Sequence, residues 1–186
     1  MIGSLNLTGH ILASQPKGPD SLFTRGIIVV AKHNDEGAWG LMVNKPTTKI
    51  SLSQVMASTR IAYSGQESIY VGGPVDTHRV HVIHSLDWQS PGTIPVTPEI
   101  GITSEMSVML AIAGGEGPNL FRTCLGVTGW AAGQLDGEYK GLPPWKPEQR
   151  WLDAPATIDA VFNLNNDEQW EKCIDIVASS KTSAWF

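Results

Sequence analysis

The amino-acid sequence predicts one α+β domain, residues 1–186, from three features of the chain. Predicted strands and helices alternate irregularly, which argues against a repeating βαβ unit. Two neighbouring apolar runs flank a short polar turn, as in an antiparallel hairpin. The length of 186 residues suits one hydrophobic core, and a composition of 41% hydrophobic and 17% charged residues can fill it.

The N-terminal segments are predicted to be strands. Residues 5–13 mix period-two alternation with a short apolar run, which is typical of a strand that becomes buried. Residues 26–32 are rich in β-branched side chains and face residues 38–43 across the polar turn 33–37. Because neither run of this hairpin alternates clearly, we expect both of its faces to be covered by other elements.

A helix is predicted next, over residues 51–60. Ser51 and Gln54 have the spacing of a capping box, and apolar residues then recur at helical intervals. Residues 104–113 predict a second helix, which begins with the capping hydroxyl of Ser104 and ends at two glycines.

The remaining strands are shorter. Residues 69–71 and 80–84 read as strands separated by the turn Gly72-Gly73-Pro74. Residues 93–102 are also strand-like, and their prolines predict a place at the edge of the sheet because proline lacks a ladder donor.

The C-terminal third adds four predicted elements. The apolar patterns indicate a buried strand over 121–127, a short helix over 131–139, a final strand over 157–162 and a helix over 167–177 capped by Asn166.

Charge argues against autonomous DNA binding. The net charge is −5, and the 13 Lys and Arg residues are scattered singly along the chain. Affinity for duplex DNA rests on clustered cations that release counterions. We therefore expect the partner to be a protein or a small ligand, with no direct contact to nucleic acid.

Compartment follows from the cysteines and from the first residues. Cys124 and Cys173 are too few and too far apart for a disulfide framework or a metal motif. The first residues lack the basic segment and the following apolar segment of a secretory signal peptide, and no run of about 18 apolar residues occurs. We expect a cytoplasmic protein without a membrane association.

His78, His81 and His84 have the spacing of ligands on one helix face, but their neighbours favour a strand. On a strand His81 faces away from the other two, and His78 lies ~20 Å from His84 at ~3.3 Å per residue. We expect no metal site there and see no motif for any other cofactor.

No catalytic residues are assigned. A serine hydrolase would place its nucleophile in a G-x-S-x-G turn, and the sequence has none. Cys124 and Cys173 both lie in apolar segments, where a thiol behaves as a small inert hydrophobe.

Several residues remain as candidate ligand contacts. Asn44 and Lys45 end a buried strand, and either present a polar edge to a ligand or simply leave the sheet. The turn Gly72-Gly73-Pro74 has two possible roles. Its backbone amides form an anion nest, or its two adjacent glycines allow another part of the chain to cross closely.

Trp130 and Gln134 are four residues apart, so on one helix they would share a face and line a pocket. The alternative is that Trp130 caps the core and Gln134 bonds to backbone. With His84, Asn44 and Lys45 they would form the pocket of an enzyme assembled from distant loops.

Three glycine-punctuated segments in this order resemble the AlgH/YqgE family of bacterial proteins. The resemblance covers about residues 9–177 and rests on the combination of segments. They are His33-Asn34-Asp35-Glu36-Gly37-Ala38-Trp39-Gly40-Leu41-Met42-Val43-Asn44-Lys45-Pro46, then Gly72-Gly73-Pro74-Val75, then Gly126-Val127-Thr128-Gly129-Trp130-Ala131-Ala132-Gly133-Gln134-Leu135.

The resemblance implies an α+β fold with a barrel-like, mainly antiparallel β core and flanking helices. Members of the family are described as uncharacterised proteins or transcriptional regulators, and no catalytic residues or cofactor are carried over from them. A cytoplasmic regulatory or binding protein is therefore expected, with an enzyme of unknown substrate as one alternative. A protein-interaction module is the other, because the proline-rich loop at about 137–150 departs from the family pattern and carries an exposed Trp145.

Overall fold

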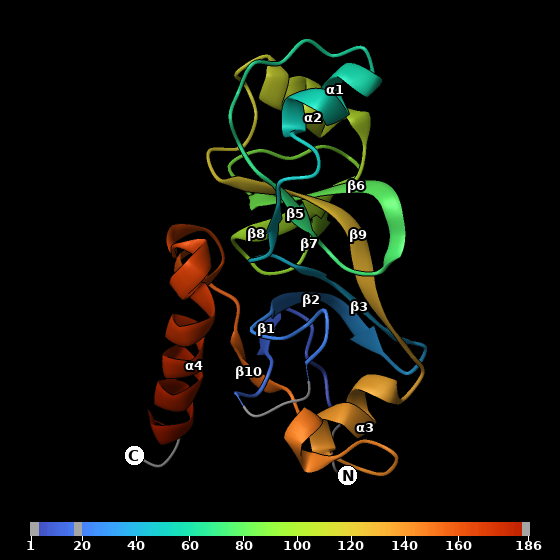
Figure 1. Cartoon of the computed structure of the whole chain (residues 1–186), viewed down its shortest axis with the longest axis vertical. Coiled ribbons are helices and arrows are strands. Elements are labelled where there is room, and N and C mark those ends of the chain that lie inside the picture. The colour runs from blue at the N-terminus through green and yellow to red at the C-terminus, as the bar shows by residue number, and fades with distance from the viewer. Residues whose placement is uncertain (1–3, 17–19, 184–186) are drawn as a thin grey trace.

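The computed structural model describes residues 4–16 and 20–183, which form one curled sheet with helices around it (Figure 1). The α+β class and the barrel-like antiparallel core are confirmed, and the sheet curls into a half-barrel. The strands are β1 (His10–Ala13), β2 (Ile27–Asn34), β3 (Gly37–Met42), β4 (Pro46–Thr47), β5 (Ile69–Val71), β6 (Val75–Ser85), β7 (Ile94–Pro95), β8 (Ile100–Thr103), β9 (Phe121–Ala131) and β10 (Leu152–Pro155). The helices are α1 (Leu52–Ser58), α2 (Met106–Ala113), α3 (Gln134–Lys140), the 3₁₀ turn η1 (Pro147–Gln149), the π-helical turn η2 (Asp159–Asn163) and α4 (Asn166–Ser183).

The sheet follows the order β10-β1-β2-β3-β9-β6-β8-β7 with antiparallel neighbours throughout. β5 pairs with β9 in parallel and with β4 in antiparallel fashion. β9 is long enough to join both halves of the molecule, with α1 and α2 at one end and α3 at the other (Figure 1). Its C-terminal end therefore delivers the chain from the core to the surface beside α3.

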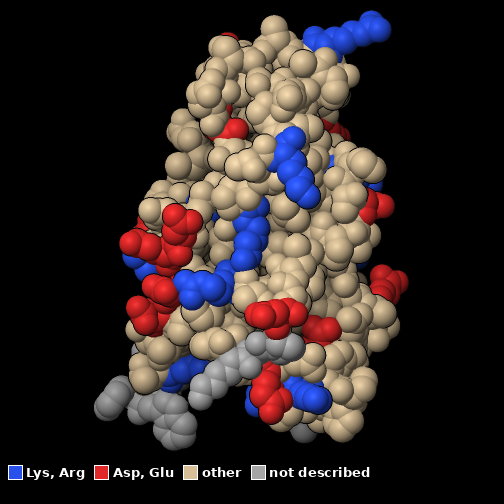
Figure 2. Space-filling model, in the orientation of Figure 1, with Lys and Arg blue, Asp and Glu red and all other residues tan. Residues whose placement is uncertain are grey.

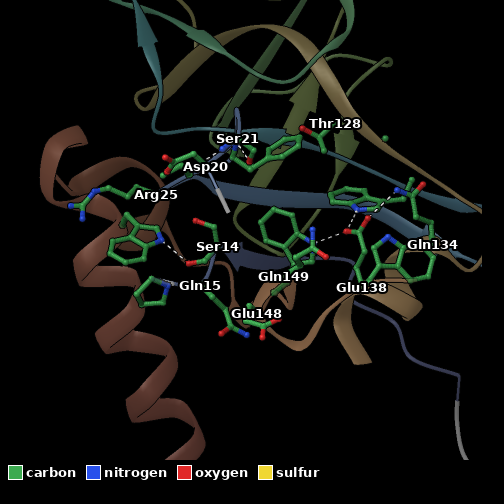
Figure 3. Close-up of a pocket in the computed structure, with 18 residues that line it drawn as sticks. Ser14, Gln15, Asp20, Ser21, Arg25, Thr128, Gln134, Glu138, Glu148 and Gln149 are labelled. Carbon is green, nitrogen blue, oxygen red and sulfur yellow. Dashed lines mark hydrogen bonds between the residues drawn. The ribbon is translucent and has the colours of Figure 1, made fainter. Parts of the chain in front are cut away.

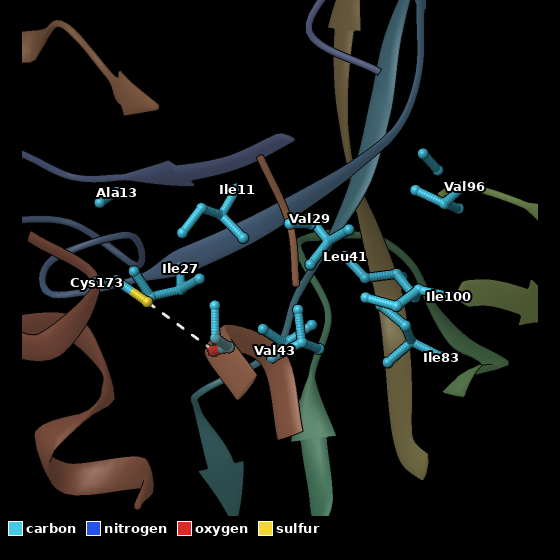
Figure 4. Close-up of a cluster of buried hydrophobic side chains, with 14 of the residues drawn as sticks. Ile11, Ala13, Ile27, Val29, Leu41, Val43, Ile83, Val96, Ile100 and Cys173 are labelled. Carbon is cyan, nitrogen blue, oxygen red and sulfur yellow. Dashed lines mark hydrogen bonds between the residues drawn. The ribbon is translucent and has the colours of Figure 1, made fainter. Parts of the chain in front are cut away.

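The predicted hairpin is confirmed as β2 and β3, whose pairing runs from Ile28 opposite Met42 to Asn34 opposite Gly37. Both of its faces are buried, as expected. Ile27 and Val29 point into a cluster that α4 covers, drawn in Figure 4, whereas Ile28 and Val30 point to the opposite side, toward Trp130 and α3. A third cluster joins α1 and α2 to β6 and holds that end of the molecule.

The capping-box prediction is also confirmed. The backbone N–H of Gln54 donates to the Ser51 hydroxyl at 3.2 Å, and the Ser51 N–H donates to Gln54 Oε1 at 2.9 Å. This reciprocal pair starts α1 one residue after Ser51. The second predicted helix is observed as α2, and it begins at Met106, two residues after Ser104.

Four sequence predictions were wrong in detail. Residues 157–162 are helical, because Thr157 Oγ1 accepts the N–H of Ala160 and starts the turn η2, while β10 forms earlier. The predicted edge position of residues 93–102 is confirmed, but the segment forms two short strands, β7 and β8, paired with each other, instead of one. Asn165, one residue before the predicted Asn166, caps α4 by accepting the N–H of Asp167.

The fourth error concerns residues 131–139. β9 continues through Ala131, where Gly37 of β3 still pairs with it, so the helix α3 starts only at Gln134. Gly133 makes the change of direction with φ of 74°, a left-handed conformation that glycine adopts without steric cost. Trp130 and Gln134 therefore lie on different elements.

Candidate functional site

A pocket of about 510 Å³ lies between α3 and α4 beside the segment that joins β1 to β2. This volume falls within the range of about 300–1,000 Å³ that is usual for small-molecule sites. Its lining combines aromatic, amide, hydroxyl and carboxylate side chains (Figure 3): Ser14, Gln15, Pro16, Asp20, Ser21, Phe23, Thr24, Arg25, Thr128, Gly129, Trp130, Gln134, Glu138, Trp145, Glu148, Gln149, Trp151 and Trp170.

Aromatic rings form much of the wall. Four of the six tryptophans among the described residues line the pocket, contributed by β9, the loop after α3, the segment before β10, and α4. Trp151 meets Phe23 edge-on with ring centroids 5.9 Å apart, and meets Trp130 edge-on at 6.3 Å. Edge-to-face packing of this kind holds the rings in fixed orientations.

The carboxylate of Glu138 is the centre of the polar contacts in the pocket. Its Oε2 accepts the indole N–H of Trp130 at 2.9 Å and that of Trp151 at 2.8 Å. Its Oε1 accepts the side-chain amide of Gln134 at 2.9 Å. Figure 3 shows these three bonds converging on one side chain. The carboxylate thus fixes two walls of the pocket.

Local sequence explains how Glu138 reaches this position. Gln134 and Glu138 are four residues apart on α3, so they lie on one face of the helix. Gln134 Oε1 also accepts the N–H of Ala131 at 3.0 Å, which ties the first turn of α3 to the end of β9. Trp130 and Gln134 were predicted to share a helical face, which was wrong, yet both line the same pocket because both bind Glu138.

Trp145 is half-buried against α3, which corrects the prediction of an exposed side chain. A Cβ built on Gly137 would lie 2.2 Å from Cζ3 of the Trp145 ring, so the indole packs directly on the backbone of the helix. Residues 137–140 of the predicted proline-rich loop belong to α3, and the part that follows the helix, which carries Trp145, is a wall of the pocket.

Asn44 and Lys45 are not part of the pocket lining, but both bind the segment that contributes to it. Asn44 is buried and bridges two backbone groups: its Oδ1 accepts the N–H of Ile27 at 2.8 Å, and its Nδ2 donates to the carbonyl of Arg25 at 2.9 Å. Lys45 Nζ donates to the carbonyl of Thr24, and burial followed by the nearby Arg25 charge lowers its pKa. Both side chains hold the segment that carries the pocket residues Thr24 and Arg25.

Comparison with known proteins gives a consistent result. A family model described as AlgH-like (DUF179) matches residues 11–180. A UPF0301 protein of Rhodospirillum rubrum is 36% identical over 159 residues, which cover 84% of this chain and 79% of that protein. A UPF0301 protein of Methylococcus capsulatus is 33% identical over 174 residues, covering 92% of each chain.

The chain belongs to the AlgH-like family.

Solved structures agree with this assignment. The solution structure of the AlgH protein from Pseudomonas aeruginosa is similar to this AlgH-like protein with a TM-score of 0.73 and 29% identity, covering 93% of this chain and 89% of that one. Protein DIP2367 from Corynebacterium diphtheriae has a TM-score of 0.71 at 16% identity, covering 93% and 88%, and it shows the fold alone.

The turn Gly72-Gly73-Pro74 of this AlgH-like protein crosses β9 at close range and does not line the pocket. A Cβ on Gly72 would lie 2.2 Å from the carbonyl oxygen of Gly126. One on Gly73 would lie 2.2 Å from the carbonyl carbon of Val127. The carbonyl of Gly72 accepts the Thr128 hydroxyl at 3.1 Å. The two glycines therefore permit a backbone crossing that places the pocket end of β9.

His84 is fully buried in the core, and both of its ring nitrogens have partners. Nδ1 donates to the carbonyl of Ser85 at 2.9 Å, so Nε2 is the acceptor for the Thr103 hydroxyl at 2.8 Å. Burial lowers the pKa of His84. His81 on the same strand binds the hydroxyl of Ser104 instead, and no group of three His, Cys, Asp or Glu side chains among the described residues is arranged to hold a metal ion.

The pocket has the means to bind and orient a molecule. The described residues that line it include neither a histidine nor a cysteine, so a nucleophile with an adjacent imidazole base is not assembled there. Cys124 and Cys173 are buried in the core, as predicted, and burial raises their thiol pKa values to about 12 and about 11. No helix within the described ranges is both long and apolar enough to cross a membrane.

Proposed function

We propose that this AlgH-like protein binds a small ligand in the pocket between α3 and α4, and that any regulatory effect follows from ligand occupancy. The observation that carries the proposal is the pre-formed pocket of about 510 Å³, in which aromatic walls surround a few converging polar groups. That combination is characteristic of small-molecule sites.

The way the pocket is built also supports binding. Its lining comes from the β1–β2 segment, β9, α3, the loop after α3, and α4, so a bound molecule would contact elements from both ends of the chain. A ligand that contacts several elements can change their relative stability, because it stabilises the arrangement to which it binds. Occupancy could then be sensed by a partner protein at the surface.

Direct regulation through DNA is not part of the proposal. On the face in Figure 2, Lys and Arg side chains stand among Asp and Glu side chains, and the net charge of the chain is −5. Such a surface favours partners other than a polyanion. A gel-shift titration of the purified protein would contradict this part if it gave sequence-selective binding that weakens with salt.

Ligand screening tests the proposal directly. A diverse library of small metabolites is added to the purified protein, and binding is followed by thermal unfolding and by intrinsic tryptophan fluorescence, since most tryptophans line the pocket. Trp145→Ala should weaken the binding of the hits at least about tenfold by removing one aromatic wall.

The matched control is Trp88→Ala, because Trp88 is also half-buried but does not line the pocket. It should leave the affinity of the hits unchanged. Finding no ligand in the library, or finding hits whose affinity is insensitive to Trp145→Ala, would contradict the proposed function.

A further inference from the structure

We propose that the pocket selects a small organic cation, an amine or quaternary ammonium compound with an apolar body, which seats its charge beside Glu138 among the indole rings. The inference rests on the proposed ligand-binding function and names the chemistry of the ligand.

The carboxylate of Glu138 has no partner cation among the described residues. Glu138 accepts three hydrogen bonds, all from uncharged donors: two indoles and one amide. Among the residues that the structure describes, no Lys, Arg or His forms an ion pair with Glu138. The neutral donors orient the carboxylate but leave its negative charge uncompensated, so the site has a net charge that a cationic ligand can balance.

The carboxylate of Glu138 can also accept one more hydrogen bond. An ionised carboxylate offers about four lone-pair positions, and the protein occupies three of them at Glu138. Oε1 has one protein donor and Oε2 has two, so the remaining position is on Oε1. Because Glu138 lines the pocket, the N–H of a protonated amine can donate to this oxygen, and a quaternary ammonium group, which has no N–H, can place its charge against it, in both cases without displacing the indoles.

Aromatic side chains share the pocket with this carboxylate. Trp130, Trp145 and Trp151 all line the same pocket as Glu138. The face of an indole attracts a cation within about 6 Å of its centroid, and this attraction is larger for Trp than for Phe or Tyr. Indole faces exposed in the cavity beside this carboxylate would therefore attract an alkylated ammonium group more strongly than a neutral group of the same shape.

Arg25 is the one cation among the described residues of the lining, and its charge is already engaged elsewhere. Its guanidinium stacks 4.7 Å from the centroid of the Trp170 ring and pairs with the carboxylate of Glu171 at 2.9 Å. In Figure 3 the Arg25 side chain extends toward α4, on the side of the pocket opposite Glu138. Asp20 and Glu148 add two further carboxylates, so acids outnumber bases among the described residues of the lining.

Matched pairs of compounds test charge recognition at constant shape. Choline is compared with 3,3-dimethylbutan-1-ol, and 3-(trimethylammonio)phenol with 3-tert-butylphenol, by isothermal titration into the purified protein. Each cation should bind at least about tenfold more tightly than its neutral counterpart. Equal affinity, or tighter binding of the neutral compound, would overturn the inference.

Glu138→Gln removes the charge while keeping an oxygen that can accept the indole N–H groups. In this variant the ratio of the affinity for the cation to the affinity for its neutral counterpart should fall to about one. Glu116→Gln, at an exposed residue outside the pocket, should leave that ratio unchanged. A circular dichroism spectrum checks that both variants are folded. A preference that survives Glu138→Gln would show that this carboxylate does not recognise the charge.

The outcomes separate the inference from the proposed function. If none of the four probes binds, the hits of the library screen decide between the two. Neutral or anionic hits whose binding is weakened by Trp145→Ala would retain the proposed function and overturn the cation inference. Cationic hits whose binding is weakened by Glu138→Gln support both. A library with no hits at all would remove the proposed function and the inference together.

Discussion

Replacing Arg122 by methionine is expected to lower the free energy of unfolding by about 3 kcal/mol. Arg122 lies on β9, and only 7% of its surface is exposed. Its guanidinium donates to the carbonyl of Val43 at 2.6 Å, to Gln169 Oε1 at 2.7 Å and to the carbonyl of Leu164 at 3.3 Å. It therefore fastens α4, one wall of the pocket, to the sheet.

The size of the effect follows from opposing contributions. Methionine retains most of the packing but leaves two short hydrogen-bond acceptors unpaired, and each costs about 1–3 kcal/mol when buried. The stacking of the guanidinium 4.9 Å from the Tyr70 ring is also lost, at about 1 kcal/mol. Against this, burial lowers the pKa of Arg122, so removing the charge relieves a desolvation penalty. The unpaired acceptors are the larger effect.

Urea unfolding followed by circular dichroism measures the change, and an unchanged m-value keeps the comparison valid. Arg79→Met, which removes an exposed cation, should stay within about 0.5 kcal/mol of the parent protein. The double variant Gln169→Leu with Arg122→Met should lose about 1–2 kcal/mol less unfolding free energy than the two single variants lose in sum. The reason is that the double variant no longer buries an unpaired Gln169 oxygen. An Arg122→Met protein as stable as the Arg79→Met control would refute this reasoning.

Three further predictions concern the pocket, the thiols and pH. Gly137→Ala should displace the ring of Trp145, because the new Cβ would lie 2.2 Å from it, although alanine favours helix α3 by up to about 1 kcal/mol. The tryptophan fluorescence emission of the folded variant should therefore shift to the red, and an unshifted spectrum would contradict this. Cys124 and Cys173 should resist a thiol reagent at neutral pH until the protein is unfolded in urea, since burial raises their pKa values to about 12 and about 11; rapid labelling of the folded chain would disprove it. Burial lowers the pKa of His84 below its ordinary 6.5, so the unfolded chain binds more protons and stability should decrease as the pH falls below that value; equal unfolding free energies at about pH 7.5 and about pH 5.5 would argue against it.

The sequence predicted the parts of the fold that depend on local chemistry. The β2–β3 hairpin was recognisable because two β-branched runs flank a polar turn, and α1 because Ser51 and Gln54 satisfy each other's backbone groups. Residues 157–162 were misassigned because an apolar run of this length is compatible with a strand or with a buried helical turn. The hydroxyl of Thr157 and the packing of α4 select the helical turn.

The amino-acid sequence by itself determined the α+β class, the family and the burial of the two cysteines, and it singled out Trp130 and Gln134 as candidate pocket residues. The tertiary structure alone decided what these two side chains do, since Glu138 joins them to an indole contributed by a later segment of the chain. Trp170 donates to the carbonyl of Ser14, and Trp130 packs against Trp151. Both contacts depend on how β1, β9, β10 and α4 come together, and no local spacing encodes that arrangement. Periodicity reports which face of an element is apolar, whereas a pocket is a property of several elements at once.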